Sequence, residues 1–149
     1  MAEGRIVVGV DGSAASRAAL HWAAREARLR GAHLEVVHAW ELPALVVAGD
    51  GGAGVPVIAP GELEQAAEDL VRREAAAITA AQCLEVTASI VRGHPAHALI
   101  EAARGADLLV VGSRGHGGFV GMLMGSVSNH VVHHAGCPVV VVRSETNPD

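Results

Sequence analysis

The chain has 149 residues, which is the length of one ordinary domain with a single hydrophobic core. Half of its residues are apolar but only 2% are aromatic, so we expect a core of alanine, valine, leucine and isoleucine. The formal net charge of −5 argues against nucleic acid as the main partner. Two cysteines, no apolar signal core and no apolar run near the roughly 18 residues of a membrane helix predict a cytoplasmic protein with free thiols.

The N-terminal part of the chain predicts a strand, a helix and a second strand. Residues 5–10 form a short β-branched apolar run without polar alternation, which is typical of a strand covered on both faces. Ser13 is suited to cap the helix that follows, and Gly31 is suited to end it. Residues 33–40 predict the second strand, so this segment has the length of a right-handed βαβ unit.

A long loop and a second helix follow. Glycine and proline dominate residues 43–61, which predicts a flexible loop, and a loop of this length is uncommon inside a compact domain. It acts either as a lid over a site or as a surface excursion. Residues 62–81 then predict an alanine-rich helix with an acidic first turn.

The C-terminal part predicts three more strands separated by helices. The strand at 83–91 alternates apolar and polar residues, as expected near a sheet edge. Pro95 suits the first turn of a helix over 96–103, and a buried strand at 107–111 comes next. The remaining elements are a glycine-rich segment at 112–128, a helix at 126–135, a strand at 138–143 and a polar tail at 144–149, which we expect to be disordered.

Five strands alternating with four helices predict an α/β fold, a mostly parallel five-stranded sheet with helices on both faces. We expect one domain over residues 1–149. Ligands of such folds bind beyond the carboxyl ends of the strands, where the winding direction reverses. Asp11 follows the first strand and Gly112 follows the fourth, so both residues meet at one crevice if these strands are neighbours.

The glycine-rich segment 112–128 has the character of an anion-binding loop. Its glycines give a ligand access to backbone amides, and the helix that follows offers free N–H groups and partial positive charge. No lysine follows the glycines, so this is not a Walker-type loop, and phosphates would be held by backbone amides, Ser126 and Arg114. Asp11 is almost the only acidic residue near the predicted site, which favours binding over phosphoryl transfer.

Simpler structural roles compete with these assignments. The glycine-rich segment could be shaped by packing alone, and Asp11 could merely cap the next helix or bond Ser13. Four apolar residues inside the segment more readily pack on the protein or on a second subunit than face a ligand: Phe119, Met122, Leu123 and Met124. Cys137 is expected to be buried.

Five histidines raise the question of a metal site. His130, His133 and His134 share one helical face, and His94 and His97 precede the fourth strand. No cysteine or carboxylate lies at matching spacing to complete a metal site, whereas histidines in the last turn of a helix complement its dipole. We therefore expect no metal ligand among them.

Three elements in this order resemble the universal stress protein family. They are residues 8–13, with the sequence VGVDGS, then Val91-Arg92-Gly93-x-Pro95, and finally Gly112-x2-Gly115-x9-Gly125-Ser126. The resemblance covers almost the whole chain. The third element is the most specific, because it resembles the nucleotide-binding signature of the ATP-binding branch and is complete here.

The resemblance implies a Rossmann-like fold of the adenine nucleotide alpha hydrolase-like type, with an ATP site. Asp11 would bond the ribose, Gly9 and Val10 would lie beside the nucleoside, and the backbone of Ala39 would hold adenine. The phosphates would be cradled by Gly112, Gly115, Gly125 and Ser126, with Val127 and Ser128 close behind. The family also forms homodimers, often through the last strand, here residues 138–142.

The resulting expectation is an ATP-binding regulatory protein of the stress response that signals through nucleotide-dependent conformation or dimerisation, with or without Mg²⁺. Three alternatives stay open. The chain could be a slow ATPase or an autophosphorylating enzyme, with Ser13, Ser126 or Ser128 as acceptor. It could bind cyclic AMP at the same site, or act as an interaction module without nucleotide.

Overall fold

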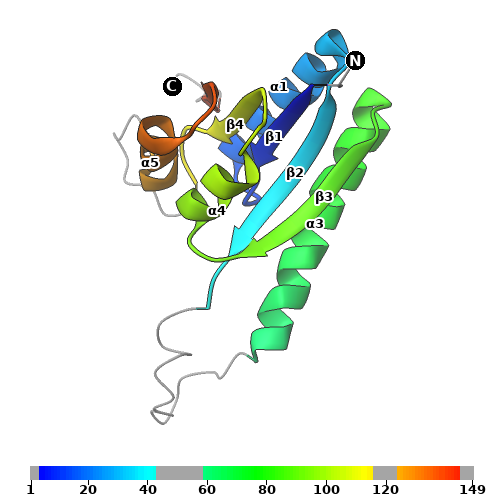
Figure 1. The fold of residues 1–149 in the computed structure, drawn as a ribbon. Helices are drawn as coiled ribbons and strands as arrows, with labels where there is room; N and C mark the ends of the chain where they lie inside the picture. Colours follow the sequence, from blue (N-terminus) through cyan, green and yellow to red (C-terminus); the bar gives the residue numbers. More distant parts are fainter. Residues whose placement is uncertain (1–3, 43–58, 116–123, 145–149) are drawn as a thin grey trace, which may run out of the picture.

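A computed structural model describes residues 4–42, 59–115 and 124–144 of the chain. These residues form an all-parallel, five-stranded sheet with helices on both faces (Figure 1). The strand order is β3-β2-β1-β4-β5. The elements are β1 (Arg5–Gly9), α1 (Ala14–Arg30), β2 (His33–Trp40), α3 (Pro60–Gln82), β3 (Val86–Arg92), α4 (Pro95–Ala102), β4 (Leu108–Gly112), α5 (Ser126–His134) and β5 (Val139–Val142).

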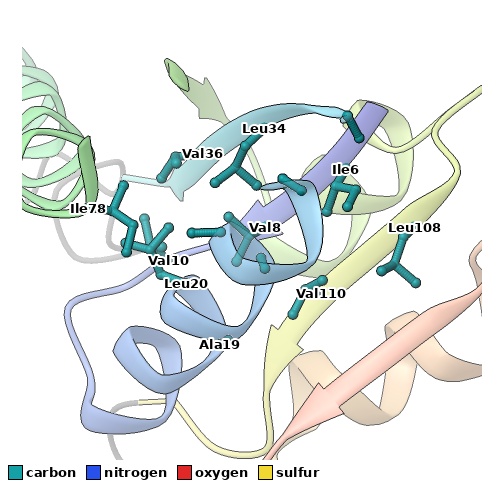
Figure 2. Close-up of a cluster of buried hydrophobic side chains, with 14 of the residues drawn as sticks. Ile6, Val8, Val10, Ala19, Leu20, Leu34, Val36, Ile78, Leu108 and Val110 are labelled. Atoms are coloured by element: carbon teal, nitrogen blue, oxygen red, sulfur yellow. The ribbon is translucent and has the colours of Figure 1, made fainter. Parts of the chain in front are cut away.

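The pleat of the strands divides the core into two layers. Ile6 and Val8 of β1 pack with α1 and α3 on one face, in the cluster that Figure 2 shows. Val7, between them, packs with α4 and α5 on the other face. All three side chains are fully buried, because a central parallel strand is covered on both sides. The predicted α/β architecture is therefore confirmed.

The ends of α1 follow the sequence signals. The Ser13 hydroxyl accepts a hydrogen bond from the Ser16 amide at 3.2 Å, which satisfies one of the free N–H groups of the first turn. Gly31 has φ 65°, in the left-handed region, and its amide bonds the last carbonyls of the helix. Both predicted caps are confirmed.

Other boundaries shift by a few residues. Helix α3 begins at Pro60, two residues before the predicted start, since proline fits the first turn. Strand β3 begins at Val86 because Cys83, with φ 52°, ends α3. As predicted, β3 lies at an edge of the sheet.

The two cysteines differ in exposure. Cys83 is exposed, and Cys137 is half-buried, not buried as the sequence analysis expected. Cys137 precedes the edge strand β5, which has a neighbouring strand on one side only. Partial burial raises the pKa of its thiol, against a smaller lowering by Arg5.

Three predicted features lie outside the described residues. They are the loop over residues 43–58 with its lid hypothesis, the apolar residues Phe119, Met122 and Leu123, and the tail from residue 145. Among the residues that the structure describes, none of the helices combines the length and the hydropathy needed to cross a bilayer.

Candidate functional site

A cavity of about 400 Å³ opens at the carboxyl edge of the sheet. It lies where β1 and β4 are neighbours and the chain leaves them in opposite directions, toward β2 and β3 on one side and toward β5 on the other. This is the switch point at which parallel α/β folds bind ligands. The first and fourth strands are therefore neighbours, which was the condition for Asp11 and Gly112 to meet at one crevice.

All eleven residues that the sequence analysis selected line this one cavity. They come from the ends of β1, β2 and β4, from the residues just after β1 and β4, and from the N-cap and first turn of α5. The residues are Gly9, Val10, Asp11, Ala39, Gly112, Arg114, Gly115, Gly125, Ser126, Val127 and Ser128.

Six further residues line the cavity but were not selected as site residues, although Pro95 belongs to the middle motif. Each of them belongs to one of the motifs or lies within two strand positions or about one helical turn of a motif or selected residue. This proximity could identify them as site residues only once the strand order was known. Pro95 and Leu99 bring α4 to the cavity wall, a role that the middle motif alone did not indicate. The six are Ser16, Val37, His38, Pro95, Leu99 and Val111.

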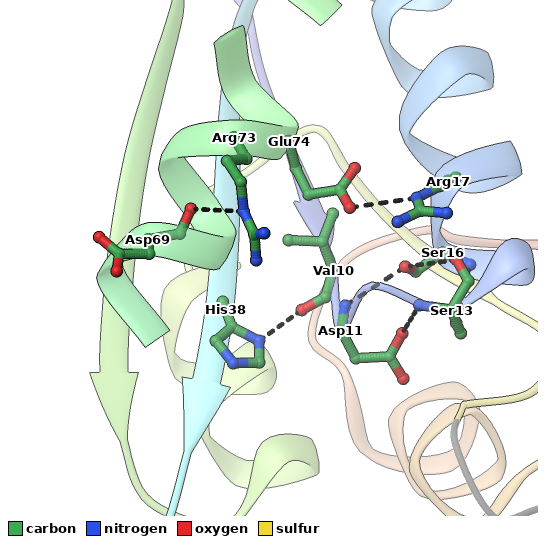
Figure 3. A network of polar contacts seen from close by, with 9 residues as sticks. All are labelled: Val10, Asp11, Ser13, Ser16, Arg17, His38, Asp69, Arg73 and Glu74. Atoms are coloured by element: carbon green, nitrogen blue, oxygen red, sulfur yellow. Dashed lines mark hydrogen bonds and ion pairs between the residues drawn. The ribbon is translucent and has the colours of Figure 1, made fainter. Parts of the chain in front are cut away.

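The Asp11 carboxylate bonds a backbone amide through one oxygen and lies close to Gly115 with the other. Its Oδ1 accepts a hydrogen bond from the Ser13 amide at 2.9 Å, and Asp11 itself lines the cavity (Figure 3). A Cβ atom built on Gly115 would lie 2.6 Å from Asp11 Oδ2. The sequence analysis considered a bond to Ser13 as an alternative to a ligand-binding role for Asp11. This bond is present and fixes one carboxylate oxygen, and Asp11 lines the cavity as well.

Two hydrogen bonds fix the backbone just after β1. The Val10 amide donates to the Val37 carbonyl at 2.9 Å, and the Val10 carbonyl lies 2.7 Å from Nδ1 of His38. Because a carbonyl only accepts, His38 donates through Nδ1. Figure 3 shows the imidazole directed at this carbonyl. The floor of the cavity is therefore a rigid backbone surface between the ends of β1 and β2.

The glycines of β1 and β4 permit close packing around the cavity. A Cβ on Gly9 would lie 2.7 Å from Cδ1 of Leu99, and one on Gly112 would lie 2.7 Å from the backbone of Ala15. Leu99 is a flexible side chain, whereas the first turn of α1 is backbone and cannot yield cheaply. Gly112 is therefore required by the fold itself, whatever the cavity binds.

Helix α5 points its N-terminus at the cavity. Gly125 occupies the N-cap with extended backbone and makes no side-chain cap, and Ser126, Val127 and Ser128 supply the first turn. The first amides of a helix have no carbonyl partner within it and carry partial positive charge. This arrangement suits an anion at the helix start.

The hydroxyl of Ser128 has a structural role. It lies 3.0 Å from the carbonyl oxygen of Ser113 and 3.0 Å from that of Gly125, and the side chain is buried. The Gly125 amide also donates to the Ser113 carbonyl, at 2.6 Å. These bonds tie α5 to the end of β4, so Ser128 could approach a ligand through its backbone, whereas Ser126 is exposed.

The charged groups of the cavity are few. Asp11 is the one carboxylate and Arg114 the one guanidinium among the described lining residues. Arg114 is half-buried, and the Ser13 hydroxyl donates to its carbonyl at 3.5 Å. Arg114 can therefore pair with an anion, while one carboxylate offers little for a metal-dependent reaction.

The five histidines singled out from the sequence gather elsewhere, on α4 and α5, and none of them lines the cavity. Over residues 4–42, 59–115 and 124–144, no group of three or more histidine, cysteine or carboxylate side chains is arranged to hold a metal ion.

The strand order and the cavity define a doubly wound α/β protein with a ligand site at its switch point. The family model of the universal stress protein family matches residues 4–143, and the chain belongs to this family. The recognition made from the three motifs is confirmed.

Relatives in sequence and in structure agree with this assignment. A universal stress protein of Mycolicibacterium smegmatis is 40% identical over 141 residues, which cover 93% of this chain and 45% of the relative. One of Mycobacterium tuberculosis is 39% identical over 139 residues, again 93% of this chain and 45% of the relative. The chain thus spans less than half the length of these relatives.

Two solved structures in the family contain adenine compounds. A universal stress protein in complex with cAMP is 28% identical, with a TM-score of 0.68 over 97% of this chain and 100% of the other. The universal stress protein from Archaeoglobus fulgidus in complex with dAMP is 26% identical, with a TM-score of 0.68 over 95% of this chain and 99% of the other.

Proposed function

We propose that the cavity between β1 and β4 binds an adenine nucleotide, with ATP as the first candidate. The chain would act as a single universal stress protein domain that regulates partners through its nucleotide state. The observation that carries this proposal is that eleven residues, selected from separate motifs, line one cavity. The cAMP and dAMP complexes of related proteins support the adenine nucleotide class.

The cavity offers a complementary group to each part of such a ligand. The N-terminus of α5 presents backbone amides, Gly112 and Gly115 carry no side chain that would fill the cavity, and Arg114 adds a cation for the phosphates. Asp11 supplies an acceptor for ribose hydroxyls, and the backbone of Ala39 lies within the same wall for adenine. The volume also lies within the roughly 300–1,000 Å³ that is typical of small-molecule sites.

Binding is favoured over turnover. Phosphoryl transfer needs carboxylates that hold metal ions and a group that positions the nucleophile. The described lining residues contain Asp11 as their one carboxylate, and its Oδ1 already bonds Ser13. We therefore expect phosphate release from ATP, or self-labelling, no faster than in a Gly125→Ala/Ser126→Ala double variant.

Titration calorimetry of the purified chain with ATP, with and without Mg²⁺, tests the proposal. Millimolar ATP occupies a site substantially once binding reaches about −4 kcal/mol, so we expect a dissociation constant below about 1 mM. The proposal fails if binding does not saturate in this range and the purified protein carries no nucleotide.

Cyclic AMP is the second candidate, favoured by the relative that holds it. Competition separates the two ligands, because they would share Asp11 and the adenine wall but differ in phosphate number. If Arg114 contacts the outer phosphates, Arg114→Gln should weaken ATP at least about tenfold, the effect of losing one charged hydrogen bond. Binding of cyclic AMP should change little.

We further propose homodimerisation through residues 138–142 and a cytoplasmic location. Strand β5 lies at an edge of the sheet, and an edge strand leaves one row of backbone groups open to pairing. Cys83 and Cys137 are free thiols, which suits a reducing compartment.

A further inference from the structure

Histidines from two helices meet along the line where α4 and α5 pack together. His94 and His97 belong to the start of α4, and His130 and His134 belong to α5. Ring centroids lie 5.3 Å apart for His94 and His97, 5.1 Å for His97 and His130, and 4.4 Å for His130 and His134. We call these four residues, together with His133, the histidine seam.

One member of the seam must be neutral for α4 to keep its cap. Nδ1 of His94 accepts a hydrogen bond from the Ala96 amide at 3.3 Å, which caps the first turn of α4. A protonated imidazole carries a proton on both nitrogens and accepts nothing. Its charge would also face the positive end of the α4 dipole. Protonation of His94 therefore removes the cap.

The seam also lacks counterions. None of the ion pairs among the described residues contains a histidine. The titratable groups that act on His130 are histidines alone, namely His134 and His133 on α5 and His97 and His94 on α4. Charges at ring separations of 4.4 to 5.3 Å lie well within the Debye length of about 8 Å, so they repel each other even at physiological salt.

Partial burial lowers the pKa of His130, and its histidine neighbours lower it further. A histidine with a lowered pKa favours the neutral form in the folded state. Below the ordinary histidine value of about 6.5, the unfolded or opened chain binds the proton more readily, so acid destabilises the packed seam.

The two helices that form the seam also form the wall of the cavity. Pro95 and Leu99 of α4 and Val127 of α5 line the cavity. Leu99 of α4 and Val131 of α5 belong to one buried cluster, and Val127 of α5 packs against it. A change in how α4 sits against α5 therefore changes the cavity wall.

We propose that the histidine seam is a proton-sensing device that loosens α4 from α5 in mild acid and thereby weakens nucleotide binding in the cavity. The coupling to the ligand rests on the proposed nucleotide site, whereas the loosening of the seam does not. Charge on the imidazoles would also attract phosphates. None of the five lines the cavity, so that attraction acts at longer range than the repulsion within the seam.

The ligand-free chain tests the seam itself. Hydrogen exchange of the α4 and α5 amides, corrected for the intrinsic rate, is compared at about pH 7.5 and about pH 5.5, on either side of the histidine range. We expect protection of both helices to fall in acid while that of α1 is retained. In a His97→Gln/His130→Gln variant the fall should be smaller in both helices, because the repulsion between them is removed and only the loss of the His94 cap at the start of α4 remains. In the control His21→Gln, an exposed histidine on α1, the fall should equal that of the wild type. Equal protection of α4 and α5 at both pH values in the wild type overturns the proposal.

ATP affinity at the same two pH values tests the coupling. The wild type and His21→Gln should lose at least about fivefold more affinity in acid than the double variant, the lower end of common coupling strengths. Protonation of ATP itself is the same for every variant. Should the double variant unfold, His134→Gln, which removes an exposed member, replaces it. Identical pH dependence in all variants refutes the coupling, while lack of ATP binding at both pH values refutes the proposed function and leaves the exchange result to judge the seam.

Discussion

At the scale of single residues, the cavity depends on how closely Asp11 and Gly115 approach. The carboxylate comes from the loop after β1 and the glycine from the loop after β4, so the contact joins the two halves of the sheet. A Cβ atom at position 115 would lie 2.6 Å from Asp11 Oδ2, so the carboxylate would have to move. If the cavity binds a nucleotide as proposed, Gly115 has two roles, since it leaves the Asp11 carboxylate in place and also leaves room for phosphate.

Gly115→Ala should therefore weaken ATP binding by about tenfold or more, the loss of one charged hydrogen bond through a displaced Asp11. Calorimetric titration measures the effect. Gly61→Ala, at a glycine in α3 with open space around it, is the matched control and should bind ATP normally. Unchanged affinity in a folded Gly115→Ala protein would place the ligand away from Asp11.

Ser126 and Ser128 should respond differently to loss of the hydroxyl. Ser128→Ala removes two hydrogen bonds but leaves the Ser113 carbonyl its bond from the Gly125 amide, so we expect the free energy of unfolding to fall by about 1 kcal/mol. Ser126→Ala should leave stability unchanged, because its side chain is exposed, and weaken ATP binding by about 1 kcal/mol. Chemical denaturation and calorimetry together distinguish the two outcomes, and a large stability loss in Ser126→Ala would contradict this division.

At the scale of elements, helix ends place the functional groups. Ser13 caps the start of α1, and Gly31 ends the same helix. Gly125 lets α5 begin without a side-chain cap. An uncapped helix start leaves amides available to a ligand, whereas a left-handed helix end serves the fold alone. The two kinds of helix end should therefore have separable effects on binding and on stability.

Gly31→Ala tests that separation. A non-glycine residue at φ 65° costs about 1 kcal/mol, and no neighbouring atom lies within 4 Å of the added Cβ, so the loss reflects backbone strain alone. We expect a lower unfolding midpoint in denaturant and an ATP affinity equal to that of the wild type. A change in affinity would show that strain in α1 reaches the cavity.

At the scale of the whole molecule, the open edge at β5 sets how copies would assemble. The Pro138 carbonyl accepts a hydrogen bond from Leu109 of β4, and the Val142 carbonyl accepts one from Ser113, just after β4. In a parallel ladder the alternate residues Val139 and Val141 therefore direct their backbone groups outward. A second copy could pair along this row. Strand β3, at the other edge, ends in Arg92 and carries Thr87 and Ser89.

Val141→Pro should convert a β5-mediated dimer into a monomer, because proline removes an outward N–H without touching a bond to β4. Sedimentation velocity at micromolar concentration measures the change. Ala88→Pro in the edge strand β3 is the matched control, because the ladder with β2 directs the Ala88 N–H outward as well, and this variant should keep the dimer. A Val141→Pro protein that remains dimeric would move the interface elsewhere.

The sequence by itself determined the elements and the family. Apolar runs, caps such as Ser13 and Gly31, and the glycine signature are local patterns, and each reflects physics that acts within a few residues. Errors in the elements stayed at their boundaries, as at Cys83, where the choice between helix end and strand start depends on a single backbone angle. The burial of Cys137 was also predicted wrongly, because burial depends on tertiary packing.

Only the tertiary structure decided which distant residues meet. Periodicity places side chains on a face of a strand or helix but carries no information on strand order. The sequence analysis therefore had to assume that β1 and β4 are neighbours, and the structure shows that they pair. That pairing brings Asp11 to Gly115. The packing of α4 on α5 likewise gathers the histidines into a seam, because contacts between segments far apart in sequence form only when the whole sheet is assembled.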